Sequence, residues 1–310
     1  MKTTIYKYLF HYLKFILPLF LFVLAVIEII PFMSSINPEL LRNEVNQFNI
    51  GKLVLVLLIS MGAVSPMFLY DSLLLKSLQK TFPKKQLLKQ SFIVNAFSNL
   101  IGSGGIISGM LRKYFYQTYE VDKQKLSKTI GNISYFYLTG LSLLALMILF
   151  AYRNNHLLEK FLWLYVVVIA VGLYLPMLIF QLVRHHDNGF PRLFGSRTKF
   201  QLIAVSFLEW TFAFLAVWLL ANILELSISF HELFPIFVVA SCVGIVSMIP
   251  GGLGSFDLIF IWGTQLVGVQ DEKVFFSTHS LSTRLLFLPI LTRCDSIYKR
   301  LLGEVECKLG

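Results

Sequence analysis

Apolar runs about 20 residues long recur along this 310-residue chain, and no other feature restricts its fold so strongly. A helix that crosses a bilayer needs a run of that length. Charged residues make up 14% of the chain, against roughly 25% in soluble domains. The sequence therefore predicts an all-α polytopic integral membrane protein. Its candidate spans cover residues of about 12–33, 53–72, 129–151, 161–183 and 201–224, with a weaker one at about 274–291.

Two further apolar stretches are interrupted by glycine. Residues 90–111 contain "IGSGGIISG", and residues 233–268 contain "IPGGLGS". Glycine lets the backbone turn sharply and approach a ligand closely, so both interruptions are candidate hinges. The hinge residues are Gly102, Gly104 and Gly105 in the first stretch, and Pro250, Gly251, Gly252 and Gly254 in the second.

The charges beside these stretches indicate how each lies in the membrane. Cytoplasmic loops are rich in Lys and Arg. Residues 76–89 carry lysines and no acid, and residues 112–128 are also basic, so both flanks of the first stretch are expected on the cytoplasmic side. Both flanks of the second stretch are poor in basic residues and are expected outside. A simple span cannot have both ends on one side, so each stretch is predicted to be a re-entrant hairpin.

The predicted architecture is an inverted repeat of about six spanning helices and two re-entrant hairpins. Three ordinary spans separate the hairpins, which inverts the second relative to the first. Inverted halves with broken helices that meet near the midplane are a recurrent transporter design. The basic N-terminus is expected to be cytoplasmic, and its first span uncleaved. The alternative is two ordinary kinked helix pairs, whose glycines permit close packing.

Net charge and metal-binding residue types exclude several classes of function. The charge of +10 is explained by basic cytoplasmic loops, so no nucleic acid partner is expected. The three cysteines form no CxxC motif, and the six histidines form no HxxxH pair. We therefore expect no metal site and no cofactor.

Ionisable residues within the apolar stretches are the candidate functional residues, because charge inside a bilayer is costly and usually serves a purpose. Asp71 ends the second span, and Arg112 ends the first glycine stretch. Glu209 lies in mid-span, and Asp257 follows the second glycine turn. Arg284 falls in the weak last segment.

Each candidate also has a structural explanation. Asp71 could be an interfacial charge that faces Lys76 or Lys80. Arg112 could extend to the interface as part of the positive-inside pattern. Glu209 could form a structural ion pair with an arginine. Asp257 could cap a helix that begins near residue 255.

The second glycine turn, together with Arg112, Glu209 and Asp257, suits a ligand that carries charges of both signs. A half-helix that begins at Gly254 or Ser255 would direct free N–H groups at a phosphate or carboxylate. Arg112 would add to such an anion site, whereas Glu209 and Asp257 would attract an ammonium group. A zwitterionic or aminoacylated phospholipid matches this set.

Several longer motifs occur in one order along the chain and resemble a known family. They are "YDSLLLKSL", "NAFSNLIGSGGIISGMLRKYFY", "LTGLSLLALMILF", "FLEW" and "SMIPGGLGSFDL", followed by "GVQDEKV". The chain resembles, from about Tyr70 to Val274, the N-terminal membrane domain of the bacterial lysylphosphatidylglycerol synthase–flippase family, also called phosphatidylglycerol lysyltransferase or multiple peptide resistance factor.

The resemblance implies a function and a site. In that family the membrane domain moves lysyl-phosphatidylglycerol from the inner to the outer leaflet of the bacterial cell membrane, which protects against cationic antimicrobial peptides. A separate soluble domain makes the lipid from lysyl-tRNA and phosphatidylglycerol. The family's polar positions match Asp71, Arg112, Glu209 and Asp257. Expected partners are these two phospholipids, and a homo-oligomer is left open.

The chain departs from the family at its C-terminal end. We expect a flippase-like domain over residues 1–276 and an atypical tail over 277–310, with no soluble synthase domain. Polar residues make the tail a poor span, which is the basis for the hypothesis that the reading frame is disturbed near Phe276. Two alternatives to translocation follow: lysyltransferase activity, as the family name states, or an inactive remnant that assembles with a full-length relative.

Overall fold

A computed structural model describes eight ranges of the chain, and all of them are helices with short connections. The ranges are residues 50–80, 83–101, 104–117, 122–152, 156–184, 194–223, 226–247 and 254–269. No strand occurs within them, which confirms the predicted all-α class. The candidate spans at 12–33 and 274–291, Arg284 and the tail from 277 lie outside the described residues.

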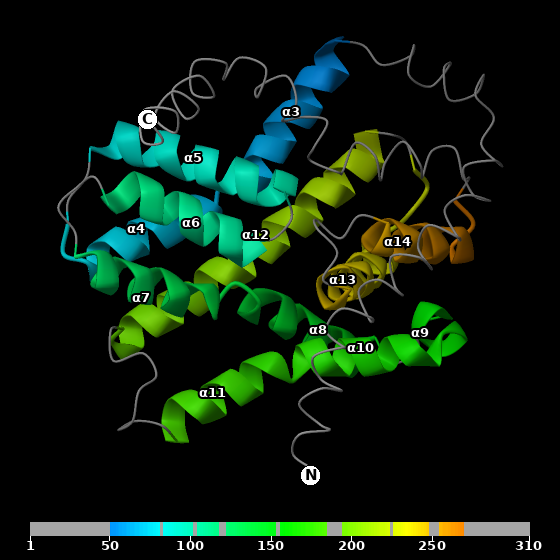
Figure 1. The fold of residues 1–310 in the computed structure, drawn as a ribbon. Helices are drawn as coiled ribbons and strands as arrows, with labels where there is room; N and C mark the ends of the chain where they lie inside the picture. The colour runs from blue at the N-terminus through cyan, green and yellow to red at the C-terminus, as the bar shows by residue number, and fades with distance from the viewer. Residues whose placement is uncertain are drawn as a thin grey trace, which may run out of the picture.

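The helices follow one another in the order shown in Figure 1. They are α3 (Ile50–Val64), α4 (Met67–Ser77), α5 (Lys84–Ile101), α6 (Gly104–Tyr116), α7 (Lys123–Ser134), α8 (Thr139–Ala151), α9 (His156–Lys160), α10 (Leu162–Gly172), α11 (Tyr174–Arg184), α12 (Ser196–Ile223), α13 (Phe230–Val246) and α14 (Ser255–Leu266).

Four runs of helix within the described ranges are long and apolar enough to cross a membrane. They are Val54–Ser77, Lys123–Ala151, Leu162–Arg184 and Ser196–Ile223. Each overlaps one predicted span, so the chain is a multi-pass membrane protein. The first three runs are each divided into two helices, whereas α12 continues for 28 residues without a break.

Neighbouring side chains satisfy the backbone where the divided runs are interrupted. The main-chain oxygen of Tyr137, between α7 and α8, accepts hydrogen bonds from Ser206 Oγ at 2.9 Å and Trp210 Nε1 at 3.1 Å, both on α12. Ser142 Oγ on α8 donates to the Gly172 oxygen at 2.8 Å, beside the break between α10 and α11. Lipid cannot hydrogen-bond a free backbone group, so such breaks need these polar partners.

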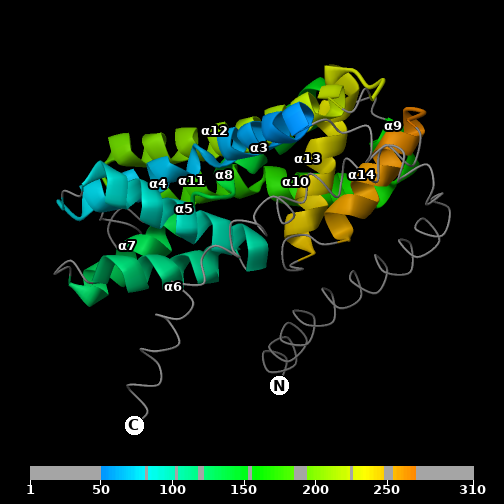
Figure 2. The same cartoon turned by 90° about the horizontal axis from the view of Figure 1, so that it is seen from above.

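Buried side chains form two cores at opposite ends of the long helices. One core lies around α4 and α7, and the other around α8, α10, α13 and α14. α12 contributes to both, through residues such as Leu202 in the first core and Phe214 in the second. Figures 1 and 2 show α12 running from one group of helices to the other.

The two glycine-interrupted stretches form helix pairs at these opposite ends. α5 packs against α6 beside the first core, and α13 packs against α14 in the second, as both views show. α6 and α14 have 13 and 12 residues, or about 20 Å of helix each, against a hydrocarbon layer of about 30 Å. Their partners α5 and α13 have 18 and 17 residues, or about 26 Å of helix each, which is close to the full hydrocarbon thickness. Helix length therefore does not distinguish re-entrant arms from ordinary spans, and re-entry stays a prediction.

Candidate functional site

Asp71 and Arg112 form a buried ion pair between α4 and α6. Arg112 Nε lies 2.7 Å from Asp71 Oδ1, and Nη2 lies 3.2 Å from Oδ2. The two residues are 0% and 3% exposed. Two parallel hydrogen bonds between a guanidinium and a carboxylate fix both the distance and the orientation of the pair. Asp71 therefore pairs with Arg112, and the alternative that it faces Lys76 or Lys80 is wrong.

The other donors of Arg112 are also occupied. Its Nη1 donates to Tyr137 Oη at 2.6 Å and to Ser108 Oγ, and its Nη2 donates to Asn95 Oδ1 at 3.3 Å. A guanidinium has five N–H groups, and with the two bonds to Asp71 all five are used. Arg112 thus does not extend to the interface, and it has no donor left for a lipid phosphate in this arrangement.

Asp71 is saturated in the same way. Besides Arg112, it accepts from Ser91 Oγ at 2.5 Å and from Tyr116 Oη at 3.0 Å. These bonds fill the roughly four lone-pair positions of a carboxylate. The partners come from α5 and α6, so the ion pair links both helices of the α5–α6 pair to α4. The geometry of the ion pair is that of a structural contact between helices.

Glu209 lies near the middle of α12 and has a different environment. Its side chain is half-buried, and its Oε2 accepts a hydrogen bond from Tyr70 Oη at 2.8 Å. Among the residues that the structure describes, no ion pair reaches Glu209, so the alternative of an arginine partner finds no support there. An ionised carboxylate accepts about four hydrogen bonds. Glu209 therefore keeps capacity to bind a cationic group.

Two tyrosines join the ion pair to Glu209. The rings of Tyr70 and Tyr137 meet edge to face with centroids 4.7 Å apart. Tyr137 Oη accepts from Arg112, and Tyr70 Oη donates to Glu209. Neither tyrosine was predicted from the sequence as a site residue. Tyr70 precedes Asp71 in the "YD" motif, which is the one signal that pointed to it.

Asp257 lies in the first turn of α14, in the α13–α14 helix pair. Its Oδ2 accepts a hydrogen bond from the Gly254 backbone N–H at 3.0 Å, which matches the capping alternative. Gly254 has φ of +79°, a left-handed conformation that favours glycine. This conformation fits the turn predicted at Gly254. The structure thus brings Asp71, Arg112 and Glu209 into one network and has Asp257 on the other helix pair.

Two of the other predicted hinge residues lie within the described ranges. Gly104 and Gly105 begin α6. Gly102, Pro250, Gly251 and Gly252 lie outside the described residues. Their role as hinges stays a prediction.

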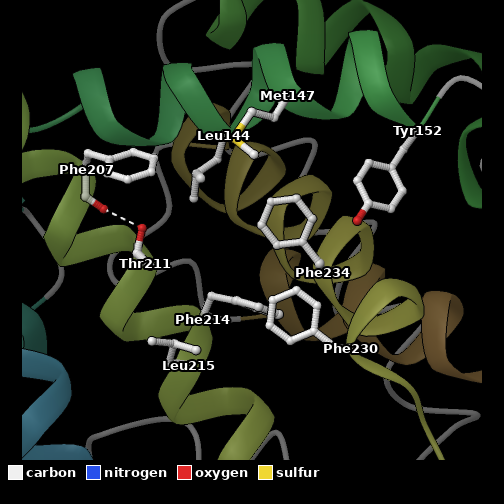
Figure 3. A pocket seen from close by; sticks show the side chains of 9 residues that line it. All are labelled: Leu144, Met147, Tyr152, Phe207, Thr211, Phe214, Leu215, Phe230 and Phe234. Atoms are coloured by element: carbon white, nitrogen blue, oxygen red, sulfur yellow. Dashed lines mark hydrogen bonds between the residues drawn. The ribbon is translucent and has the colours of Figure 1, made fainter.

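An apolar cleft of about 220 Å³ opens between α8, α12 and α13 (Figure 3). It carries no charged side chain, and the Thr211 hydroxyl on its wall donates to the Phe207 main-chain oxygen at 2.7 Å. Tyr152 Oη at its edge lies 3.3 Å from His231 Nδ1. The cleft is therefore chemically distinct from the network around Arg112. Its lining residues are Leu144, Met147, Tyr152, Phe207, Thr211, Phe214, Leu215, Phe230 and Phe234.

The sequence matches known proteins over most of its length. Residues 14–279 match the family described as "Lysylphosphatidylglycerol synthase TM region". The chain is 32% identical over 285 residues to a protein of Staphylococcus aureus strain MRSA252 named phosphatidylglycerol lysyltransferase, which covers 91% of this chain. A protein of the same name from Staphylococcus haemolyticus is 30% identical over 281 residues, or 90% of this chain. The chain spans 33% of the length of each relative. It belongs to the lysylphosphatidylglycerol synthase transmembrane-region family.

Proposed function

We propose that the chain moves lysyl-phosphatidylglycerol from the inner to the outer leaflet of a bacterial cell membrane. Support comes from the family and from relatives named phosphatidylglycerol lysyltransferase, whose name joins a lysyl group to this lipid. In the proposal the N-terminus is cytoplasmic, and the two hairpins give access from opposite leaflets. Exported lysyl lipid lowers the negative surface charge and so weakens binding of cationic antimicrobial peptides.

The observation that carries the proposal is the free capacity of Glu209. A carboxylate in mid-span is costly without a partner, and membrane proteins keep such groups on substrate pathways. Lysine adds two amino groups to the anionic phosphatidylglycerol headgroup. An ammonium group has three N–H donors and no acceptor, so it complements a carboxylate that has unfilled lone pairs. Glu209 would provide a binding site for this ammonium group in the middle of the membrane.

The ion pair has a supporting role in this proposal. Because Asp71 and Arg112 saturate each other, they hold the first hairpin to α4 while Glu209 contacts the headgroup. A direct role for Arg112 at the lipid phosphate requires this pair to open. Asp257 would support the second hairpin by stabilising the start of α14.

Substitution of Glu209 by the isosteric glutamine tests the proposal. Cells that express this chain together with a lysyl-phosphatidylglycerol synthase are treated with a membrane-impermeant amine reagent, which labels outer-leaflet lysyl lipid. We expect Glu209→Gln to lower the labelled fraction about tenfold at unchanged total lysyl lipid, because a hydrogen bond to a charged group is worth about 1.5–3 kcal/mol.

Glu232→Gln is the matched control. Glu232 is an exposed acid in the first turn of α13, where it accepts from Ser229, and glutamine can keep that bond. The control should leave the labelled fraction unchanged. An unchanged fraction in Glu209→Gln, with the variant present at the wild-type level, contradicts the proposal. Lysyl lipid made in cells that express this chain alone would instead support lysyltransferase activity.

A further inference from the structure

We propose that Tyr70 is a positioning residue for headgroup recognition: it holds one oxygen of the Glu209 carboxylate so that the other faces the lipid's ammonium group. The inference rests on the proposed function and assigns a second residue to the same site. It makes the Tyr70–Glu209 pair, joining α4 and α12, the element that binds the cation.

Tyr70 is a buried residue whose hydroxyl needs a hydrogen-bond partner. Its side chain is 2% exposed, although it carries a hydroxyl in a membrane-spanning run. A buried hydroxyl without a partner is costly, so it is normally hydrogen-bonded. Tyr70 Oη meets this need by donating to Glu209 Oε2 at 2.8 Å. The same bond restricts the rotamers of Glu209, which is otherwise a flexible side chain.

The two oxygens of the Glu209 carboxylate differ in their hydrogen bonds. Tyr70 donates to Oε2, and within the described ranges no donor reaches Oε1. Glu209 is half-buried as a residue, and in the described part of the chain its Oε1 is not among the enclosed polar atoms that lack a partner, so this oxygen is not sealed off from a ligand. An ammonium group can donate to Oε1 without displacing Tyr70. One oxygen is therefore occupied by the protein, and the other is available.

Neighbouring groups hold the ring of Tyr70 in place. Its ring packs edge to face on Tyr137, whose hydroxyl accepts from Arg112 at 2.6 Å and whose main-chain oxygen is held from α12. Edge-to-face aromatic pairs are directional. Tyr70 consequently cannot rotate without disturbing this neighbour. The position of the Glu209 carboxylate is thus tied to the saturated ion pair of the first hairpin.

Tyr70→Phe tests the inference because it keeps the ring and removes only the donor. The 310-residue chain is reconstituted in vesicles with increasing mole fractions of lysyl-phosphatidylglycerol that carries a fluorophore on one acyl chain. Outward transfer is followed with an impermeant quencher. We expect the half-saturating mole fraction to rise about three- to tenfold while the maximal rate changes less than about twofold, the pattern of a lost binding interaction.

Two further variants separate positioning from general damage. Tyr174→Phe also deletes one phenolic donor, which binds the Tyr135 main-chain oxygen at 2.7 Å, but it does not touch Glu209. It should leave the half-saturating fraction unchanged. If Tyr70 acts through Glu209, adding Tyr70→Phe to Glu209→Gln should have no additional effect, because coupled residues are not additive.

Each result decides between the inference and the proposed function. If the wild-type chain transfers the lipid and Tyr70→Phe has the wild-type half-saturating fraction, the inference is overturned and the function stands. A fall in maximal rate alone assigns Tyr70 a structural role and also overturns it. If the wild-type chain transfers no more lysyl lipid than protein-free vesicles, the proposed function fails, and the inference fails with it.

Discussion

The two helix pairs of this protein are attached to the rest of the fold by different forces. The α5–α6 pair is fastened to α4 by the buried Asp71–Arg112 ion pair and its hydrogen bonds. The α13–α14 pair is embedded in apolar and aromatic contacts, such as that of Phe214 with Phe234, whose ring centroids lie 5.0 Å apart. Ion pairs in hydrocarbon are directional and costly to separate, whereas apolar contacts exchange readily with lipid tails. The first pair thus depends on two specific charged side chains, whereas the second depends on many apolar contacts.

The largest expected effect comes from breaking the ionic attachment. Arg112→Ala leaves Asp71 buried without its counter-ion, and we expect it to lower the free energy of unfolding by about 3–5 kcal/mol. The measurement is thermal unfolding of the purified protein in detergent. Asp71→Asn combined with Arg112→Gln removes both charges but keeps side chains that can hydrogen-bond the surrounding polar groups, and it should cost less than Arg112→Ala. A double variant as unstable as Arg112→Ala would contradict the assignment of the pair as a compensated charge.

A smaller effect is expected from crowding the second pair. A Cβ on Gly263 in α14 would lie 2.6 Å from Ile236 Cγ2 on α13, so Gly263→Ala should lower the free energy of unfolding by about 1–3 kcal/mol. Gly131→Ala in α7 is the matched control, because nothing lies within 4 Å of its Cβ position. This control should be neutral or stabilising by up to about 1 kcal/mol. Equal losses in both variants would show that the α13–α14 contact is not specially tight.

The smallest effect is expected at the start of α14. Asp257→Ala removes the acceptor for the Gly254 N–H and should cost about 1 kcal/mol. Hydrogen exchange should accelerate at the first turn of α14 and remain unchanged in α6. Faster exchange in α6 would mean that the two ends are coupled more strongly than their contacts suggest. Loss of lipid transfer at wild-type stability would give Asp257 the substrate role that its family position implies.

Much of the fold was predictable because a helix that crosses a lipid bilayer must be long and mostly apolar. The spans at 53–72, 129–151, 161–183 and 201–224 all correspond to helical runs. The interruptions at Pro66 and Tyr137 were not predicted, since the latter depends on polar partners on α12. Hydropathy shows where a segment can cross a membrane. It does not show which side chains will repair a break in it.

The candidate site was predictable as a set of residues but not as a set of contacts. The cost of buried charge selected Asp71, Arg112 and Glu209, which the structure has in one network. Their partners depend on segments far apart in the chain, as in the Tyr70–Glu209 bond across 139 positions. Spacing along the sequence carries no information on such a bond. Sequence spacing also could not show that all five N–H donors of Arg112 would be occupied by other side chains.

The uninterrupted length of α12 has a consequence for how the two ends communicate. Its 28 residues extend about 42 Å, whereas the hydrocarbon layer is about 30 Å thick. The helix must therefore tilt, or project into the headgroups at Arg197 and Lys199. Because α12 contacts both α4 and α13, a change in its tilt would displace its contacts with both helices. Bilayer thickness would then affect the positions of both helix groups through the tilt of α12.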